Sequence, residues 1–419
     1  MMPHIARRVV LAIVVFILTA CGSAAAAPLT LVDAIDRALA FAPSVSMASA
    51  DRDVTNARAR EQRAPLYPNV TAGTEYYQAP GYNTIVTNSG LSSALLALNY
   101  TAWDWGRRQA QYRAARYVSE AATLGVAATR AQIAFDVSIA YYDLVHARQA
   151  ERELSRNLDR LSRYVATVEA LQASGIAIAN DVLKMRSARD SGELALSSAR
   201  NATRRAVSSL GSLIGQFDLA DIEVVDITDI PGLPNGDIAQ TPALQAASRA
   251  ISSAELQVQA AKAARLPTFQ IALTTGFLGV NPTATVNHSY GASYDGIVSM
   301  PVFDGGAISS RIDQAKAKQN GAEAQFRQTH YLLERRLKDA SVRYDEARDA
   351  LAILARAQPT ADDAFALAWT RFLGGGGATI LEVLDAYQQA EQLRIERLNH
   401  QFVAREAAAE TALLYGQSR

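Results

Sequence analysis

Hydrophobic residues recur at helical spacing along most of this chain, and two pairs of long segments dominate the pattern. Between 107 and 173 the sequence has no proline, and from Leu154 its apolar positions advance in steps of three and four residues. Such steps are typical of a coiled-coil seam. The pattern predicts one long helix over 107–173 and a second over 180–214, and the same pair recurs at 307–373 and 379–415.

Shorter segments ahead of each long helix alternate between polar and apolar residues. They predict strands at 69–80 and 91–103, and again near 267–278 and 288–303. In the last of these, apolar and aromatic residues occupy one face and small polar residues the other. A strand between lipid and a water-filled lumen shows this alternation, and so does a strand of an ordinary β-sandwich.

A further helix is predicted over 30–63. Thr30 is a candidate cap because Asp33 follows three residues later, and Pro43 predicts a kink or a restart. The stretch 218–242 holds a possible short strand at 222–225 and then the prolines and glycines of a linker.

The landmarks of the first half recur in the same order in the second half. The motif Trp103-Asp104-Trp105-Gly106 corresponds to Phe303-Asp304-Gly305-Gly306, so that its aspartates are 200 residues apart. After each predicted helical turn, Asp181-Val182-Leu183 corresponds to Glu382-Val383-Leu384. A duplication of this length predicts one structural unit built twice.

The duplication sets the expected domain boundaries. A signal peptide is expected over 1–26, a first repeat over 29–216, a linker over 217–242 and a second repeat over 243–416. Each repeat holds a helix, a β-hairpin and a long helical hairpin. The tips of the helical hairpins are predicted at Gly175 and at Gly374, Gly375, Gly376 and Gly377, because glycine suits a chain that turns through positive φ.

Composition and charge exclude several classes of function. The chain has 41 basic and 41 acidic residues, whereas nucleic-acid binding needs a basic excess. Its five histidines are scattered, and no metal-ligand spacing, nucleophile elbow or phosphate-binding loop occurs. We therefore expect no enzyme activity and no bound cofactor or metal.

The N-terminus has the pattern of a secretory signal. Arg7 and Arg8 precede an apolar run from Val9 to Leu18, and no later stretch reaches the roughly 18 apolar residues that a transmembrane helix needs. Cys21 is the single cysteine, and Leu18-Thr19-Ala20-Cys21 resembles a bacterial lipoprotein cleavage site. The alternative, cleavage near Ala26, would discard this cysteine with the signal.

Four strands per chain cannot form a closed barrel, since about eight strands is the practical minimum. An open sheet with an apolar face would also leave edges that pair with other chains. A ring of identical chains solves both problems, and three chains would supply twelve strands.

These landmarks resemble the TolC-like outer-membrane efflux protein family, also called outer membrane factors, over residues 29–416. The resemblance rests on the duplicated strand-end motif, on the turns followed by Asp/Glu-Val-Leu, and on Leu413-Leu414-Tyr415-Gly416. It implies a mixed α/β membrane protein: a trimeric twelve-stranded β-barrel in the bacterial outer membrane, continued by a coiled-coil α-helical tunnel in the periplasm. It also implies an efflux role, as the exit duct for an inner-membrane pump and a periplasmic adaptor.

The resemblance also assigns roles near the tips. Glu382 and Asp385 match acids that form rings at the periplasmic entrance, and Asp181 matches an acid of the entrance latch. The latch partners are absent, because Ala378 stands at the arginine position and Leu373 at the tyrosine position. We therefore expect packing of Leu373 and Ile380 to close the gate. The glycine tips are expected to receive the adaptor.

Three alternatives stay open. The duct of a type I protein secretion system would share every feature above. A periplasmic coiled-coil adaptor also has a long helical hairpin, although it would have one hairpin instead of two. Lipidation of Cys21 is disfavoured, because the eight steps from Cys21 to Leu29 span at most about 29 Å, whereas helix 30–63 would be about 50 Å long.

Overall fold

The computed structural model describes residues 28–87, 90–216, 224–227, 229–280, 289–374 and 377–416. The expected signal peptide and Cys21 lie outside these residues. Two compact units divide the chain. The sheet unit consists of Ser44–Thr129 and Asp237–Glu334, and the hairpin unit of the chain up to Pro43, Arg130–Gly236 and Arg335–Arg419.

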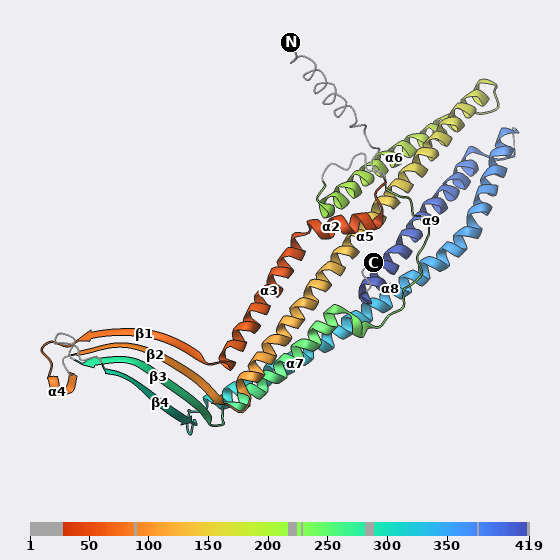
Figure 1. The fold of residues 1–419 in the computed structure, drawn as a ribbon. Coiled ribbons are helices and arrows are strands. Elements are labelled where there is room, and N and C mark those ends of the chain that lie inside the picture. The colour runs from red at the N-terminus through yellow and green to blue at the C-terminus, as the bar shows by residue number, and fades with distance from the viewer. Residues whose placement is uncertain are drawn as a thin grey trace, which may run out of the picture. The chain divides into compact units, whose positions relative to one another are not determined.

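The sheet unit contains one antiparallel sheet in the order β1-β2-β3-β4. Its strands are β1 (Asn69–Gln78), β2 (Gly90–Trp103), β3 (Thr268–Val280) and β4 (Ser289–Ser299) (Figure 1). The strand predicted over 288–303 was too long at its end, because Pro301 has no N–H to donate to a ladder. The predicted loop after β1 contains a short helix, α4 (Thr84–Thr87).

Helices adjoin one end of this sheet. α3 (Pro43–Arg63) leads into β1 through a 3₁₀ turn (Ala64–Leu66), and α7 (Pro242–Ala263) leads into β3. α5 (Arg107–Ala173) begins after β2, and α8 (Ala307–Leu373) begins after β4. Small buried side chains allow close packing among these helices, and the Ser253 hydroxyl donates to the Ala114 carbonyl at 3.0 Å.

The Asp of each repeated motif caps the long helix that follows it. The Asp104 carboxylate accepts from the Arg108 N–H at 3.0 Å, and the Asp304 carboxylate accepts from the equivalent Ile308 N–H at 2.6 Å. Backbone hydrogen bonds also lower the pKa of Asp304. The next position turns through positive φ in both copies, with Trp105 at 59° and Gly305 at 64°.

The hairpin unit is built from two helical hairpins. α5 pairs with α6 (Ala179–Ile214), and α8 pairs with α9 (Ile380–Leu414). α2 (Leu31–Phe41) packs on α6, and the predicted interruption by Pro43 is confirmed as a break at Ala42 between α2 and α3. The four long helices match their predicted ranges within one residue at each end. Among the described residues, no helix is both long enough and apolar enough to cross a bilayer.

Three clusters of buried residues hold the hairpin unit together, and the first joins α2, α5 and α6. There the Tyr141 hydroxyl lies 2.9 Å from the Leu29 carbonyl oxygen and 3.1 Å from that of Val225. Val224 forms a single parallel bridge with Leu29. A strand was predicted over 222–225, but residues 222 and 223 lie outside the described ranges. In the described part, Val224 and Val225, the structure has this single bridge.

Arg405 fixes the linker to α9. Its side chain is 1% exposed and donates to the backbone carbonyls of Ile227 at 2.6 Å and Asp229 at 3.3 Å. Burial lowers the pKa of this guanidinium. The linker is therefore held by a buried cation that hydrogen bonds to backbone oxygens.

Candidate functional site

The register of the sheet separates its side chains into two faces. Residues that lie directly opposite each other on paired strands point to the same face. One face is mainly apolar and carries Val70, Ala72, Tyr76, Leu96, Leu98, Tyr100, Phe269, Ile271, Leu273, Phe277, Tyr290, Tyr294 and Val298, together with the polar Thr74, Ser92 and Thr275. The alternation predicted for the last strand is therefore confirmed, and it extends over all four strands.

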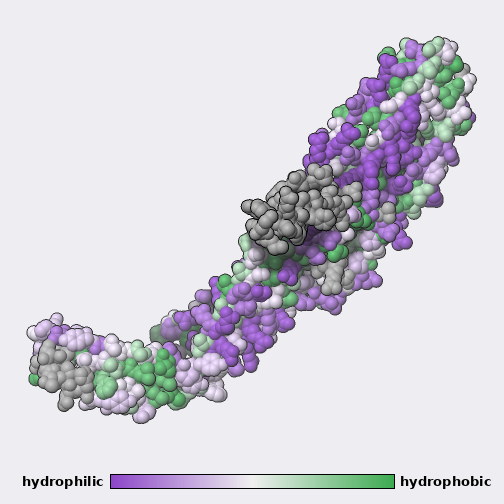
Figure 2. Space-filling model, turned by 45° about the horizontal axis from the view of Figure 1, so that its top comes forward, coloured by the Kyte–Doolittle hydropathy of each residue, from purple (hydrophilic) through white to green (hydrophobic). Residues whose placement is uncertain are grey.

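The opposite face is mainly polar or small. It carries Asn69, Thr71, Gly73, Glu75, Ser93, Ala97, Asn99, Gln270, Ala272, Thr274, Ser293, Asp295 and Ser299, together with Leu91, Leu95, Leu278, Ile297 and Tyr77. Figure 2 shows hydrophobic side chains gathered over part of the sheet, whereas the long helices are mostly hydrophilic. Tyr294 is 78% exposed and Val298 is 70% exposed, so this chain leaves its apolar face uncovered.

An irregularity in β2 places Trp103 on the apolar face. Thr101 pairs with Gln270 on the polar face, and the register then shifts so that Trp103 pairs with Phe269. Without the shift, strict alternation would point Trp103 to the polar face. The Trp105 and Trp103 rings meet edge-on, with their centroids 5.9 Å apart. The Trp105 indole N–H donates to the Pro267 carbonyl at 2.9 Å.

The first helical tip turns as the sequence predicted. Gly175 has φ 80°, and the Ile176 N–H donates back to the Leu171 carbonyl at 2.9 Å, which closes the end of α5. Asp181 lies in the first turn of α6, where its carboxylate accepts from the Ile178 N–H at 3.1 Å. This hydrogen bond gives Asp181 a capping role.

The second tip starts α9 with a capping box. The Thr379 N–H donates to the Glu382 carboxylate at 2.8 Å, and the Glu382 N–H donates to the Thr379 hydroxyl at 3.3 Å. Glu382 and Asp385 are exposed and lie three residues apart on α9. Gly374 and Gly377 do not have positive φ, and Gly375 and Gly376 lie outside the described residues.

Close to the tips, the two hairpins share one apolar cluster, which we call the tip core. It contains Leu161, Val165, Val168, Ala177, Val182, Met185, Phe372, Ile380, Val383, Leu384 and Tyr387. Ile380 is 2% exposed, but Leu373 is 39% exposed. Phe372 is the buried residue at this end of α8, and its helical spacing from Phe365 and Trp369 is the signal that could have found it.

Aromatic rings line the junction between the hairpins. The centroid of the Tyr164 ring on α5 lies 4.7 Å from that of Trp369 and 5.5 Å from that of Phe365, both on α8. It lies 5.8 Å from the ring centroid of Tyr387 on α9. Rings at these distances stabilise a contact beyond their buried area. Burial raises the pKa of Tyr387 to about 12.

A half-buried network of charges adjoins the tip core, and the sequence reasoning missed it. Glu391 on α9 accepts from Arg160 and Asn157 on α5, each at 2.8 Å, and pairs with Arg394 one turn later. Its side chain is 11% exposed. Arg394 also pairs with Asp362 on α8.

Glu153 extends this network along α5. Its carboxylate lies 3.0 Å from Arg160 and 3.3 Å from Arg156. Burial by itself raises the pKa of Glu153. The hydrogen bond and the charge of Arg160 lower it by more than burial raises it, so the pKa lies below its usual value. The three-residue spacing of Glu391 and Arg394 could have predicted their ion pair from the sequence. The contacts of these two residues with α5 and α8 could not be predicted, because they join separate helices.

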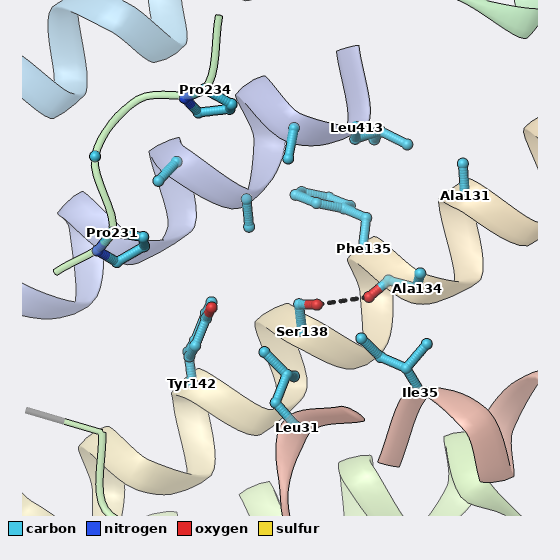
Figure 3. Close-up of a pocket in the computed structure, with 14 residues that line it drawn as sticks. Leu31, Ile35, Ala131, Ala134, Phe135, Ser138, Tyr142, Pro231, Pro234 and Leu413 are labelled. Carbon is cyan, nitrogen blue, oxygen red and sulfur yellow. Dashed lines mark hydrogen bonds between the residues drawn. The ribbon is translucent and has the colours of Figure 1, made fainter. Parts of the chain in front are cut away.

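A separate cavity of about 240 Å³ opens among α2, α5, α9 and the linker (Figure 3). Leu31 and Ile35 of α2 and Phe135 of α5 give it an apolar lining. The Ser138 hydroxyl donates to the Ala134 carbonyl at 2.7 Å, and burial raises the pKa of Tyr142. Within the described ranges, no group of three His, Cys, Asp or Glu residues could hold a metal ion.

Comparison with known proteins finds the same organisation elsewhere. The sequence profile of the family described as outer membrane efflux protein matches residues 34–216 and 233–417. TolC of Escherichia coli is 25% identical over 402 residues, a match that covers 85% of this chain and 77% of TolC. CyaE of Bordetella pertussis is 28% identical over 313 residues, which cover 71% of this chain and 65% of CyaE.

Solved structures share the fold. The outer membrane protein VceC from Vibrio cholerae has a TM-score of 0.82 at 22% identity, with 92% of this chain and 96% of VceC covered. The outer-membrane channel OprN has a TM-score of 0.81 at 21% identity, with 92% and 89% covered. The expected fold class is confirmed at the level of the chain, whose described residues form four strands and two long helical hairpins.

Proposed function

This chain belongs to the outer membrane efflux protein family, and from that premise we propose that it is the outer-membrane exit duct of a tripartite efflux pump. The observation that carries the proposal is the two-faced sheet. An apolar, aromatic face suits lipid and a face of small polar residues suits a wet lumen. The relatives that match include TolC and a pyoverdine export outer membrane protein of Pseudomonas aeruginosa.

The open edges of the sheet support a homotrimer. Among the described residues, β1 pairs with β2 alone and β4 pairs with β3 alone, so each chain offers two unpaired edges. Closure of three sheets gives twelve strands without a free edge, in a barrel wide enough to hold water. With the barrel in the outer membrane, where the family is located, the helical hairpins extend into the periplasm.

Conduction through this duct is passive. The mechanism needs no covalent step, because an inner-membrane pump supplies the energy and a periplasmic adaptor couples it to the duct. The adaptor docks at the tips, at Gly175 and the glycines 374–377. Substrates then pass from the periplasmic entrance to the outside of the cell through the wet lumen.

The entrance is controlled by charge and packing. In a trimer, Glu382 and Asp385 supply six carboxylates, and a ring of carboxylates in a pore favours cations. Asp181 adds negative charge at the start of α6. The closed state is held by the tip core around Ile380, with the exposed Leu373 available for contacts between protomers. The aromatic contacts and the Glu391 network keep the two hairpins of one chain together.

The test of this function uses two neighbouring residues on opposite faces of β3. Leu273→Arg places a cation on the lipid face, which costs about 2–4 kcal/mol near the bilayer midplane. Thr274→Arg is the matched control, because it places the same charge on the lumen face. We expect the Leu273 variant to lose assembled trimer in outer membranes, and the Thr274 variant to assemble with an altered ion selectivity.

The measurement combines trimer yield in outer membranes with single-channel recording in planar bilayers. Wild-type protein should conduct without nucleotide. Equal assembly of both variants, or a stable monomer with no conductance, would contradict the proposal.

A further inference from the structure

Charge is unevenly distributed between the two ends of the long helices. The ten residues nearest the sheet in α3, α5, α7 and α8 (54–63, 107–116, 254–263 and 307–316) contain 10 basic and 3 acidic residues. The ten residues nearest the tips in α5, α6, α8 and α9 contain 3 basic and 4 acidic residues. The chain as a whole is neutral, so this positive excess belongs to the sheet end.

All ten of these cations lie in the sheet unit, and we call them the basic collar. They are Arg58, Arg60, Arg63, Arg107, Arg108, Arg113, Arg116, Lys262, Arg311 and Lys316. Figure 1 shows the ends of α3, α5 and α7 meeting the same end of the sheet. Chain connectivity brings α8 there as well, because it starts eight residues after β4 ends.

Most of the collar is available to a ligand. Arg108 pairs with Asp104, Arg116 with Glu120, and Lys316 with Asp313. Within the part of the chain that the structure describes, the other seven have no carboxylate at ion-pair distance, and six of these seven are exposed. Unpaired cations at this density repel each other, so anions would stabilise them.

Aromatic side chains lie between the collar and the apolar face of the sheet. Tyr67, Trp103 and Trp105 lie at junctions between strands and helices. Their side chains are exposed, with exposed fractions of 54%, 58% and 51%. The Arg63 guanidinium donates to the Tyr67 hydroxyl at 2.7 Å and so links the two layers. An apolar face, then amphipathic rings, then cations matches the layers of a bilayer from its core outward, which are hydrocarbon, interface and anionic headgroups.

We propose that the basic collar binds the phosphate groups of anionic phospholipids in the leaflet that faces the periplasm. The inference rests on the proposed membrane location of the sheet. Guanidinium and ammonium groups bind phosphate oxygens by charge and by hydrogen bonding, and four helix ends supply them around the sheet. A patch of anionic lipid would thereby be retained around each duct.

The test replaces four collar cations whose side chains make no hydrogen bond or ion pair among the described residues. The variant is Arg58→Gln, Arg60→Gln, Lys262→Gln and Arg311→Gln. The control removes the same number of charges from the hairpin unit, with Arg163→Gln, Lys184→Gln, Arg371→Gln and Arg397→Gln. Each protein is reconstituted with phosphatidylglycerol and phosphatidylcholine, extracted in mild detergent, and analysed by native mass spectrometry for retained lipid.

Wild-type and control trimers should retain phosphatidylglycerol in preference to phosphatidylcholine, and the collar variant should retain less than half as much. The preference should weaken as the salt concentration rises, because exposed charges are screened. Equal retention by all three proteins would overturn the proposal. It would also be overturned if the collar variant kept its lipid but changed the ion selectivity of the channel, since the collar would then face the lumen.

Failure of the proposed function has a different signature. In that case wild-type protein would neither assemble in the membrane nor conduct. A wild-type channel that conducts but shows no preference for anionic lipid would therefore refute the collar alone.

Discussion

At the scale of single residues, the acids near the tips divide into two kinds. Glu382 and Asp385 are exposed on α9. Glu391, two turns further along the same helix, is buried against Arg160 and Asn157. Sequence pattern placed all three acids on one predicted helix. It could not tell them apart, because burial depends on which helix packs against each face.

Removing the charge of Glu391 should destabilise the hairpin unit. Glu391→Gln leaves the Arg160 and Arg394 guanidinium groups partly buried without their carboxylate, which should lower the free energy of unfolding by about 3 kcal/mol. Glu396→Gln is the control, because its acid accepts from Gln392 on an exposed helix face. Chemical unfolding of the assembled protein measures the difference. Equal midpoints for the two variants would mean that the network contributes no net stability.

The lowered pKa of Glu153 predicts a dependence on pH. The folded state binds this proton less readily than the unfolded state, whose glutamates titrate near 4.5. The stabilising contribution is therefore present above that value and is lost as the pH falls through the lower, folded-state pKa. Wild-type protein should lose unfolding free energy more steeply than Glu153→Gln as the pH is lowered from neutrality into this range. Parallel curves would contradict the assignment.

At the scale of elements, the two hairpins begin their second helices in the same way. Asp181 and Glu382 occupy equivalent positions in the first turns of α6 and α9, and both carboxylates accept a backbone N–H three residues earlier. The repeat had aligned these acids, and the resemblance had assigned them to a gate. Their hydrogen bonds add a structural role, so loss of either side chain would affect a helix end as well as the charge of the proposed pore entrance.

The two roles can be separated by substitutions that keep the cap. Glutamine at position 382 still accepts the Thr379 N–H, as in other capping boxes, but it carries no charge. Glu382→Gln combined with Asp385→Asn should reduce cation selectivity in bilayer recordings without changing helix stability. Thr379→Ala should do the reverse, with a loss of about 1 kcal/mol at the start of α9. Hydrogen exchange at residues 380–383 reports the second effect.

At the scale of the whole molecule, the sheet is incomplete in one chain. Its outer strands β1 and β4 come from different repeats, and each has a free edge among the described residues. The apolar face across all four strands requires lipid or protein to cover it. A closed ring of chains satisfies the edges and presents this face to lipid.

Cross-linking between strands tests that closure. Thr71→Cys on β1 and Ser293→Cys on β4 place one thiol each near opposite edges of the sheet. Proteins carrying one substitution each, when mixed and treated with a short bifunctional reagent, should form covalent products between different chains. Either variant alone should yield little, because its own thiols lie on equivalent strands of separate protomers. Each chain carries one thiol, so a product joins two chains, and the absence of such products from the mixture would contradict closure by a ring of chains.

The sequence by itself determined the elements and their repetition. Hydrophobic spacing located the long helices, alternation located the strands, and the copied motif showed that one unit occurs twice, because these periods depend on local backbone geometry. Tertiary structure alone decided the rest. The shift that turns Trp103 to the apolar face, the burial of Phe372 in place of Leu373, and the partners of Glu391 all depend on contacts between segments far apart in the sequence. No local pattern encodes those contacts, since they arise only when the helices and strands pack together.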